Sequence, residues 1–197
     1  MSEVWPPTMV VIGIAMLQGA RHAHIGAIQR AANELAMDIE IVELRTAEDL
    51  QKQSIDALML PGGESTVMRL RGNDAASRLL PELFSWIREN DSRPVLATCA
   101  GAILLADPQD GGEPLVDADI DRNAYGGQAD SFESELDCGF PGIFIRAPRF
   151  GEVRDPIECT LDGEVVGIRR GNRIAVTFHP ELSEDSRYHR MLLEACA

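Results

Sequence analysis

The chain has 197 residues, 45% of them hydrophobic, which suits one well-packed α/β domain, and we expect a single domain over residues 1–197. Its formal net charge of −14, with Lys52 as the only lysine, argues against nucleic acids and anionic membranes as partners, because both require a basic surface. No apolar run is long enough to span a membrane and no signal-like segment stands at the N-terminus, so we expect a cytoplasmic location.

Buried strands and amphipathic helices alternate in the first half of the chain. Continuous apolar runs predict the strands, and apolar residues at helical spacing predict the helices between them. The strands are expected at residues 9–16, 39–44, 57–60 and 95–97, and the helices at 22–36, 46–50 and 74–90. This alternation is typical of a parallel sheet with helices on both faces. We therefore predict a three-layer α/β/α fold, flavodoxin-like, with a mostly parallel central sheet.

Short strands dominate the second half of the chain. They are expected at residues 115–120, 142–146, 157–161, 165–168 and 173–178, with tight turns at 163–164 and 170–172. A last helix is predicted over residues 186–196. Because no linker or repeat separates the two halves, we expect these strands to extend the same sheet as antiparallel strands at its edge.

Cys99 stands where the strand at 95–97 meets an apolar helical run that starts at Ala100. A sharp strand-to-helix turn places a side chain beyond the carboxyl end of the sheet and directs backbone N–H groups toward it. That environment favours a thiolate, so Cys99 is a candidate nucleophile. The alternative is that Cys99 is a small buried apolar residue, as most free cysteines are.

A nucleophilic cysteine needs a base, and the base needs a group that orients it. His179 follows an apolar strand, and Pro180 biases it toward an extended conformation. In an extended segment Glu181 points the same way as His179 and reaches its ring, which is the role of the acid in a triad. The alternative is a solvated turn. The other histidines are expected to have surface or capping roles: His22, His24 and His189.

A pair of glycines, Gly62 and Gly63, follows the strand at 57–60. Paired glycines let backbone N–H groups approach a ligand closely, and such donors can hold the oxyanion formed when a thiolate attacks a carbonyl. The alternative is a plain turn with a helix cap at Ser65 or Thr66. We expect no phosphate-binding loop and no metal site, because the P-loop pattern is absent and the four cysteines are widely spaced and far from histidines.

These segments together resemble the class I, triad-type glutamine amidotransferases. The resemblance is closest to one branch, the glutaminase subunits of pyridoxal 5′-phosphate synthases, and it extends over about residues 10–193. The stretches that carry it are LPGGEST at 60–66, TCAG at 98–101, FHPEL at 178–182, LQGA at 17–20, RNAYGGQADSFE at 122–133 and GIFIRAP at 142–148. The last two stretches are the most specific to this branch.

By this resemblance Cys99 is the nucleophile, His179 the base and acid, and Glu181 the residue that orients it. The backbone N–H groups of Gly63 and Ala100 would form the oxyanion hole. The residues that match the glutamine-binding positions of the family are Gly63, Glu64, Ser65, Arg122, Ile145 and Arg146. Arginine suits the carboxylate of a free amino acid, and carbonyl or carboxyl oxygens suit its ammonium group. Without the resemblance, both arginines would be interpreted as surface charges.

The resemblance implies hydrolysis of L-glutamine to L-glutamate and ammonia, with no metal and no bound cofactor. It also implies that the ammonia passes to a separate synthase subunit, which builds pyridoxal 5′-phosphate from a pentose phosphate and a triose phosphate. The glutaminase is then expected to be weak or silent until the two subunits dock. The alternatives are the glutaminase subunit of another class I amidotransferase, such as that of the histidine pathway, a triad hydrolase of other amides, and a non-enzymatic regulatory domain on the same fold.

Overall fold

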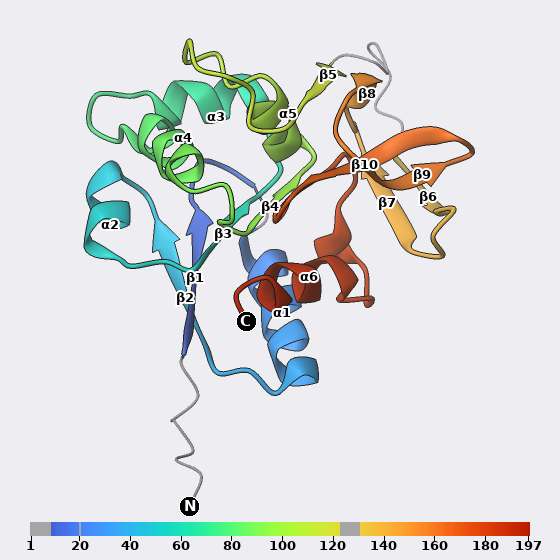
Figure 1. Cartoon of the computed structure of the whole chain (residues 1–197), viewed down its shortest axis with the longest axis horizontal. Helices are drawn as coiled ribbons and strands as arrows, with labels where there is room; N and C mark the ends of the chain where they lie inside the picture. Colours follow the sequence, from blue (N-terminus) through green and yellow to red (C-terminus); the bar gives the residue numbers. More distant parts are fainter. Residues whose placement is uncertain (1–8, 20, 123–130) are drawn as a thin grey trace, which may run out of the picture.

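The computed structural model describes residues 9–19, 21–122 and 131–197, and its elements surround a twisted central sheet (Figure 1). The strands are β1 (Val10–Ala15), β2 (Ile39–Leu44), β3 (Ala57–Leu60), β4 (Val95–Thr98), β5 (Ala118–Asp121), β6 (Ser131–Glu135), β7 (Pro141–Ile145), β8 (Arg149–Val153), β9 (Ile157–Leu161), β10 (Glu164–Arg170) and β11 (Arg173–Val176). The helices are α1 (Arg21–Leu35), α2 (Ala47–Lys52), α3 (Ser65–Gly72), α4 (Leu79–Glu89), α5 (Ala100–Ala106) and α6 (Arg187–Glu194), with a 3₁₀ turn η1 (Pro180–Leu182). Within these described ranges, no helix is both long and apolar enough to cross a bilayer.

The central sheet has the strand order β2-β1-β3-β4-β11-β10-β9. Neighbouring strands from β2 to β11 run parallel, whereas β10 and β9 are antiparallel to their neighbours. The predicted α/β fold with a mostly parallel sheet and added antiparallel strands is therefore confirmed. The expectation for the second half was wrong in two respects. Strand β11 is parallel to β4, and the pairs β5–β8 and β6–β7 form separate two-stranded sheets instead of extending the edge.

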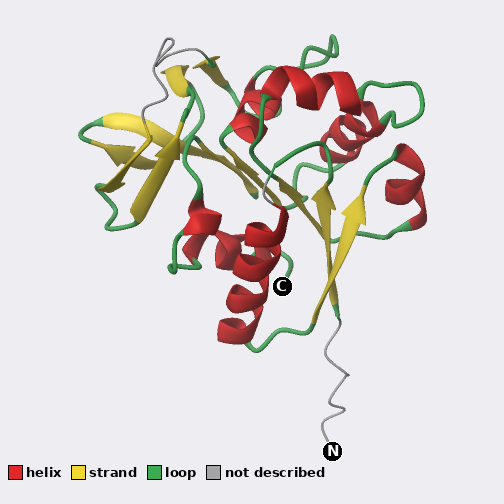
Figure 2. Cartoon of the chain, turned by 180° about the vertical axis from the view of Figure 1, so that it is seen from behind, coloured by secondary structure: helices red, strands yellow, loops and turns green. Residues whose placement is uncertain are grey.

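Helices cover both faces of the sheet. Helices α1 and α6 pack together on one face, and α2, α3, α4 and α5 lie on the other, as Figures 1 and 2 show from opposite sides. The buried stripe of α1 has the i, i+3, i+4, i+7 spacing of an amphipathic helix and comprises His24, Ala27, Ile28, Ala31 and Ala32. The two faces hold separate apolar clusters. In open parallel sheets ligands bind beyond the carboxyl ends of the strands, so a site is expected at that edge.

The segment after β3 differs from its prediction. A helix here was expected only in the alternative of a cap at Ser65 or Thr66. The cap of α3 is instead Glu64, whose carboxylate accepts hydrogen bonds from the backbone N–H groups of Thr66 and Val67. The predicted helix at 74–90 begins only at Leu79, since Arg78 has a positive φ of 48° that interrupts helical geometry. Residues 74–78, which were predicted as the first part of that helix, therefore lie in a short polar turn between α3 and α4.

An aromatic cluster fixes the hairpin β6–β7 to the main domain. Phe132 stacks on Phe144 with ring centroids 4.7 Å apart, and Phe144 lies 5.7 Å from Phe178. Phe178 in turn contacts Tyr188 of α6 edge-on at 5.3 Å. Since Phe178 directly precedes His179, this packing determines where the backbone of His179 runs. Strands β6 and β8 were not predicted.

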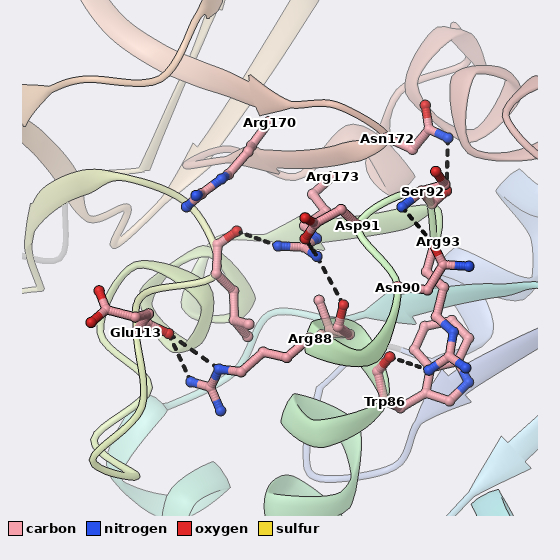
Figure 3. A network of polar contacts seen from close by, with 12 residues as sticks. Trp86, Arg88, Asn90, Asp91, Ser92, Arg93, Glu113, Arg170, Asn172 and Arg173 are labelled. Atoms are coloured by element: carbon pink, nitrogen blue, oxygen red, sulfur yellow. Dashed lines mark hydrogen bonds and ion pairs between the residues drawn. The ribbon is translucent and has the colours of Figure 1, made fainter.

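Arg173 lies at the amino-terminal end of β11, beside the amino-terminal end of β4, and forms the polar contacts drawn in Figure 3. It is 3% exposed and donates hydrogen bonds to the carbonyls of Ile87 and Leu115 and to the Asp91 carboxylate, which is 2.7 Å away. The Ile87 carbonyl belongs to the last turn of α4 and has no partner further along that helix. The arginine thereby joins α4 to the start of β11, and so helps to set β11 beside β4.

Candidate active site

Three neighbouring strand ends converge at the carboxyl edge of the sheet. Strand β3 leads into Gly62, β4 leads into Cys99, and β11 leads into His179, and the three strands are adjacent in the order β3-β4-β11. Parallel neighbours deliver their carboxyl ends to the same edge, so residues far apart in sequence meet there.

Cys99 occupies a strained turn between β4 and α5. Its φ of 49° and ψ of −112° lie outside the favoured regions, and its backbone N–H donates to the Val176 carbonyl at 2.8 Å. The residue is 6% exposed. Gly101 allows α5 to approach β3, because a Cβ there would lie 2.3 Å from the Leu60 carbonyl oxygen. The sulfur is thus held at the start of a helix with little freedom to move.

His179 and Glu181 are joined by a short hydrogen bond. The distance from His179 Nδ1 to Glu181 Oε1 is 2.7 Å, and the Glu181 side chain is 2% exposed. The segment is not extended as the sequence interpretation assumed. His179 has φ −109° and ψ 82°, and residues from Pro180 form the 3₁₀ turn η1, which brings the carboxylate back toward the ring. The backbone N–H of His179 also donates to the Ile143 carbonyl of β7.

The electrostatics of this group favour a protonated imidazole beside a carboxylate. Burial alone lowers the pKa of His179, but hydrogen bonds to Cys99 and Glu181 outweigh it and raise that pKa to about 10. Burial opposes ionisation of Glu181 as well, yet the hydrogen bond from His179 keeps its pKa below the ordinary value. A histidine held between a thiol and a carboxylate can shuttle protons to and from the sulfur.

The glycine pair lies against the cysteine and the histidine. A Cβ on Gly62 would lie 3.0 Å from His179 Cε1 and 3.2 Å from Cys99 Cβ, so only glycine lets this backbone come so close. Gly63 has a φ of 154°. The loop is braced from the turn that follows β1, because the Glu64 N–H donates to Gln18 Oε1 at 2.6 Å. Sequence reasoning quoted Gln18 only as part of a motif and missed this contact.

The predicted glutamine-binding positions lie in two places. Glu64 is exposed and Ser65 is buried, and the Glu64 pKa is lowered by the N–H groups that it caps, with a smaller contribution from the exposed Arg122. The Ile145 carbonyl lies 4.0 Å from Cys99 Sγ, and the exposed Arg146 beside it has a positive φ of 45°. Most of the motif at 122–133 falls on residues 123–130, outside the described residues, as does Ala20.

Two of the histidines that were expected on the surface are fully buried. His24 of α1 and His189 of α6 are 0% exposed, and His24 lies 3.4 Å from Glu181, whereas His22 is exposed as expected. The signal was present in the sequence. His24 begins the buried stripe of α1, and His189 has apolar residues three and four positions later, Leu192 and Leu193.

Comparison with known proteins identifies the relatives of this chain. Residues 14–197 match the model of the SNO glutamine amidotransferase family. "Pyridoxal 5′-phosphate synthase subunit PdxT" of Methanothermobacter thermautotrophicus is 39% identical, over 94% of this chain and 96% of the relative. The protein of the same name from Thermococcus onnurineus is 41% identical, over 94% and 98%. A solved structure titled "Crystal structure of glutamine amidotransferase" superposes with a TM-score of 0.75 at 34% identity, over 94% of this chain and 98% of that one.

Proposed function

The chain belongs to the SNO glutamine amidotransferase family, and from this we propose that it is the glutaminase subunit of a pyridoxal 5′-phosphate synthase. In this proposal it hydrolyses L-glutamine to L-glutamate and ammonia through Cys99, His179 and Glu181. The observation that supports this chemistry best is the geometry at the carboxyl edge of the sheet, where Cys99 and His179 both lie against Gly62 and His179 Nδ1 is 2.7 Å from Glu181.

The reaction follows from the roles of these groups. The Cys99 sulfur attacks the side-chain amide carbon of glutamine, and the carbonyl electron pair moves onto the oxygen. His179 protonates the amide nitrogen as the carbon–nitrogen bond breaks, which releases ammonia and leaves a glutamyl thioester. Water, deprotonated by His179, then attacks the thioester carbon, and glutamate leaves as the sulfur takes back its electrons. Glu181 orients the ring and stabilises its charged form throughout.

Backbone donors complete the site. The N–H groups of Gly63 and Ala100 are proposed to hold the oxyanion, which the position of Ala100 at the start of α5 and the close approach of Gly62 to Cys99 support. Glutamine itself is proposed to lie between the segment that begins at Gly63 and the segment at Ile145. Arg122 and Arg146 supply positive charge for its carboxylate, and Glu64, Ser65 and the Ile145 carbonyl supply oxygens for its ammonium group.

A separate synthase subunit is the proposed recipient of the ammonia. The names of the curated relatives support this partner, since they describe a subunit of pyridoxal 5′-phosphate synthase. We propose that docking of that subunit raises the glutaminase rate, and that the pair works in the cytoplasm. Neither a metal nor a bound cofactor takes part in the proposed hydrolysis.

A glutaminase assay with and without the synthase subunit tests this function. Ammonia release from L-glutamine is expected to increase on addition of the synthase subunit. Cys99→Ala is expected to lower it by about three orders of magnitude or more, since no other group replaces the nucleophile. Cys138→Ala is the matched control, because Cys138 is also a free thiol and is exposed.

Each alternative has its own outcome in this assay. Full glutamine-dependent activity of the complex with Cys99→Ala, and no Cys99-dependent ammonia release by the chain itself, would refute the enzyme assignment and favour a regulatory domain. Stimulation by a synthase of the histidine pathway, and none by a pyridoxal synthase, would move the chain to another class I system. Hydrolysis of unrelated amides at rates equal to that of glutamine would favour a general triad hydrolase.

A further inference from the structure

Two buried histidines lie next to each other, and one of them contacts Glu181. His24 comes from α1 and His189 from α6, and both side chains are 0% exposed. Their ring centroids are 5.6 Å apart, with the ring planes tilted by 50°. A buried imidazole carries a desolvation cost unless its polar atoms are paired, so two such rings in contact beside a carboxylate require an explanation.

The rings extend the line of contacts that begins at the cysteine. Glu181 Oε1 accepts from His179 Nδ1 at 2.7 Å, and the same oxygen lies 3.4 Å from His24 Nε2. His24 Nδ1 in turn lies 3.3 Å from His189 Nε2. One carboxylate oxygen therefore sits between two imidazoles. The other oxygen, Glu181 Oε2, is buried and has no hydrogen-bond partner among the described residues.

The positions of the protons follow from burial. Desolvation lowers the pKa of His24 to about 4 and that of His189 to about 3, so both rings are neutral near pH 7 and each carries one N–H. His189 Nδ1 is buried without a partner in the described part of the chain. A bare lone pair there is less costly than an orphaned N–H, which places the His189 proton on Nε2. That N–H then donates to His24 Nδ1.

The position of the single ring proton of His24 determines which group this histidine can donate to. With Nδ1 acting as an acceptor, the single N–H of His24 is on Nε2, which faces Glu181 Oε1 and the Thr98 hydroxyl, each 3.4 Å away. The opposite tautomer would turn a lone pair of His24 toward the carboxylate, which repels it, and would leave an unpaired N–H on His189. Both costs favour the same arrangement of protons.

We propose that His24 is a positioning residue of the glutaminase: its Nε2–H holds the Glu181 carboxylate against His179, and His189 fixes the tautomer of His24. This inference rests on the proposed function and deepens it. With Oε2 unpaired, the hydrogen bond from His179 and the electrostatic contact with the Nε2–H of His24, 3.4 Å from Oε1, keep the buried carboxylate in one orientation. The orientation of Glu181 then sets the direction in which His179 meets the sulfur, in the way that outer groups orient the ligands of a metal.

Substitutions at His24 test the donor directly. In glutamine hydrolysis with the synthase subunit present, His24→Leu is expected to lower kcat about 10–100-fold while KM changes less than about twofold, because the defect lies in the triad and not in binding. His24→Gln places an amide N–H near the position of Nε2 and is expected to retain kcat within about threefold of wild type. His22→Leu, on the exposed side of the same helix, is the matched control and is expected to behave as wild type.

A double substitution tests the role of His189. His189→Leu is expected to lower kcat about 3–10-fold when His24 is present, because the His24 tautomer is no longer fixed. In the His24→Gln background the same change is expected to have no further effect, since an amide has no tautomer to fix. This cycle retains a polar donor beside Glu181 and therefore decides the matter even if His24→Leu does not fold.

The outcomes separate this inference from the proposed function. Equal kcat in wild type and His24→Leu, or equal losses in His24→Leu and His24→Gln with a lowered melting temperature, would show that His24 only packs. Additive losses in the double substitution would refute the role of His189. If the wild type releases no ammonia in a Cys99-dependent way, the proposed function fails. The proton resonance of His179 Nδ1–H, which His24→Leu should shift and His24→Gln should retain, then still tests the positioning.

Discussion

Gly62 illustrates how one residue without a side chain shapes the candidate site. The space that a methyl group would need is occupied by His179 Cε1 at 3.0 Å and Cys99 Cβ at 3.2 Å. Both neighbours are themselves held, Cys99 by the start of α5 and His179 by its bond to Glu181. Any added atom must therefore move the reacting groups or the loop.

Gly62→Ala is expected to lower glutaminase kcat by at least about tenfold, since displacements well under 1 Å already impair aligned reacting groups. The melting temperature should change little, because a small shift of the loop relieves the contact. Gly26→Ala on α1 is the control, as the nearest atom to its added Cβ is 3.8 Å away, and it should stabilise the helix by roughly 0.5–1 kcal/mol. If Gly62→Ala keeps the wild-type kcat, the loop moves to accommodate the added Cβ without displacing Cys99 or His179.

The buried histidines also make stability depend on pH. The pKa of His24 is lowered to about 4 and that of His189 to about 3, mainly by burial, whereas in the unfolded chain both return to about 6.5. Below that value the unfolded state binds protons that the folded state does not accept. Stability present above pH 6.5 is therefore lost as the pH falls toward 4 and then 3.

Urea unfolding at a series of pH values measures this loss. Each histidine is expected to contribute up to roughly 1.4 kcal/mol per pH unit between pH 6.5 and about 4. The double variant His24→Gln, His189→Gln should show a shallower decline, whereas His22→Gln should follow the wild type. Parallel curves for the double variant and the wild type would mean that the two rings are protonated in the folded state.

At the scale of elements, the contact between α4 and β11 depends on one buried arginine. Arg173 satisfies two carbonyls that have no other partner in the described contacts, at Ile87 and Leu115, and pairs with Asp91 (Figure 3). The Asp91 side chain is 95% exposed, so the ion pair itself is screened by solvent. Arg173 therefore stabilises the fold mainly through its hydrogen bonds to the backbone carbonyls.

Arg173→Met is expected to lower the free energy of unfolding by about 2–4 kcal/mol, because it leaves buried carbonyls unpaired while preserving most of the apolar volume. Asp91→Ala removes only the exposed partner and should lower it by less than about 1 kcal/mol. Chemical denaturation of the two variants beside the wild type measures both. Equal effects would show that the ion pair, and not the backbone contacts, stabilises this end of the sheet.

Sequence patterns predicted the elements whose buried residues form a clear apolar run or stripe, and failed where geometry depends on one residue. Strands β1 to β4 and helix α1 agree with their predicted spans within two residues, because burial on both faces or one face leaves a clear pattern. The start of α3 was misplaced because it depends on one side chain, that of Glu64, which caps the first turn of the helix. Strands β6 and β8 were missed because most of their residues are exposed or half-buried, so that neither strand has a clear apolar pattern.

At the scale of the whole molecule, the net charge of −14 acts on every element at once. Like charges on a compact surface repel one another, and the unfolded chain relieves that repulsion by expanding. Salt screens these interactions, since the Debye length falls from about 10 Å at 0.1 M to about 3 Å at 1 M.

The melting temperature is therefore expected to rise by several degrees between about 0.02 M and 1 M NaCl at pH 7. Thermal unfolding followed by circular dichroism measures the change. KCl at the same ionic strengths is the control, because general screening does not distinguish the two cations. A melting temperature that falls with salt would mean that surface ion pairs, such as Arg154 with Asp117, outweigh the net repulsion.

The sequence by itself determined the α/β alternation, the family, and the three segments that end in Gly62, Cys99 and His179, because short-range patterns and motifs are local properties of the chain. Only the tertiary structure decided that β11 lies parallel to β4, which brings His179 beside Cys99 across 80 residues of sequence. It also decided that His24 and His189 are buried together, with His24 against Glu181. Apolar residues at helical spacing beside each histidine indicate a buried face, but the groups that the histidine meets there depend on which other helix packs against it.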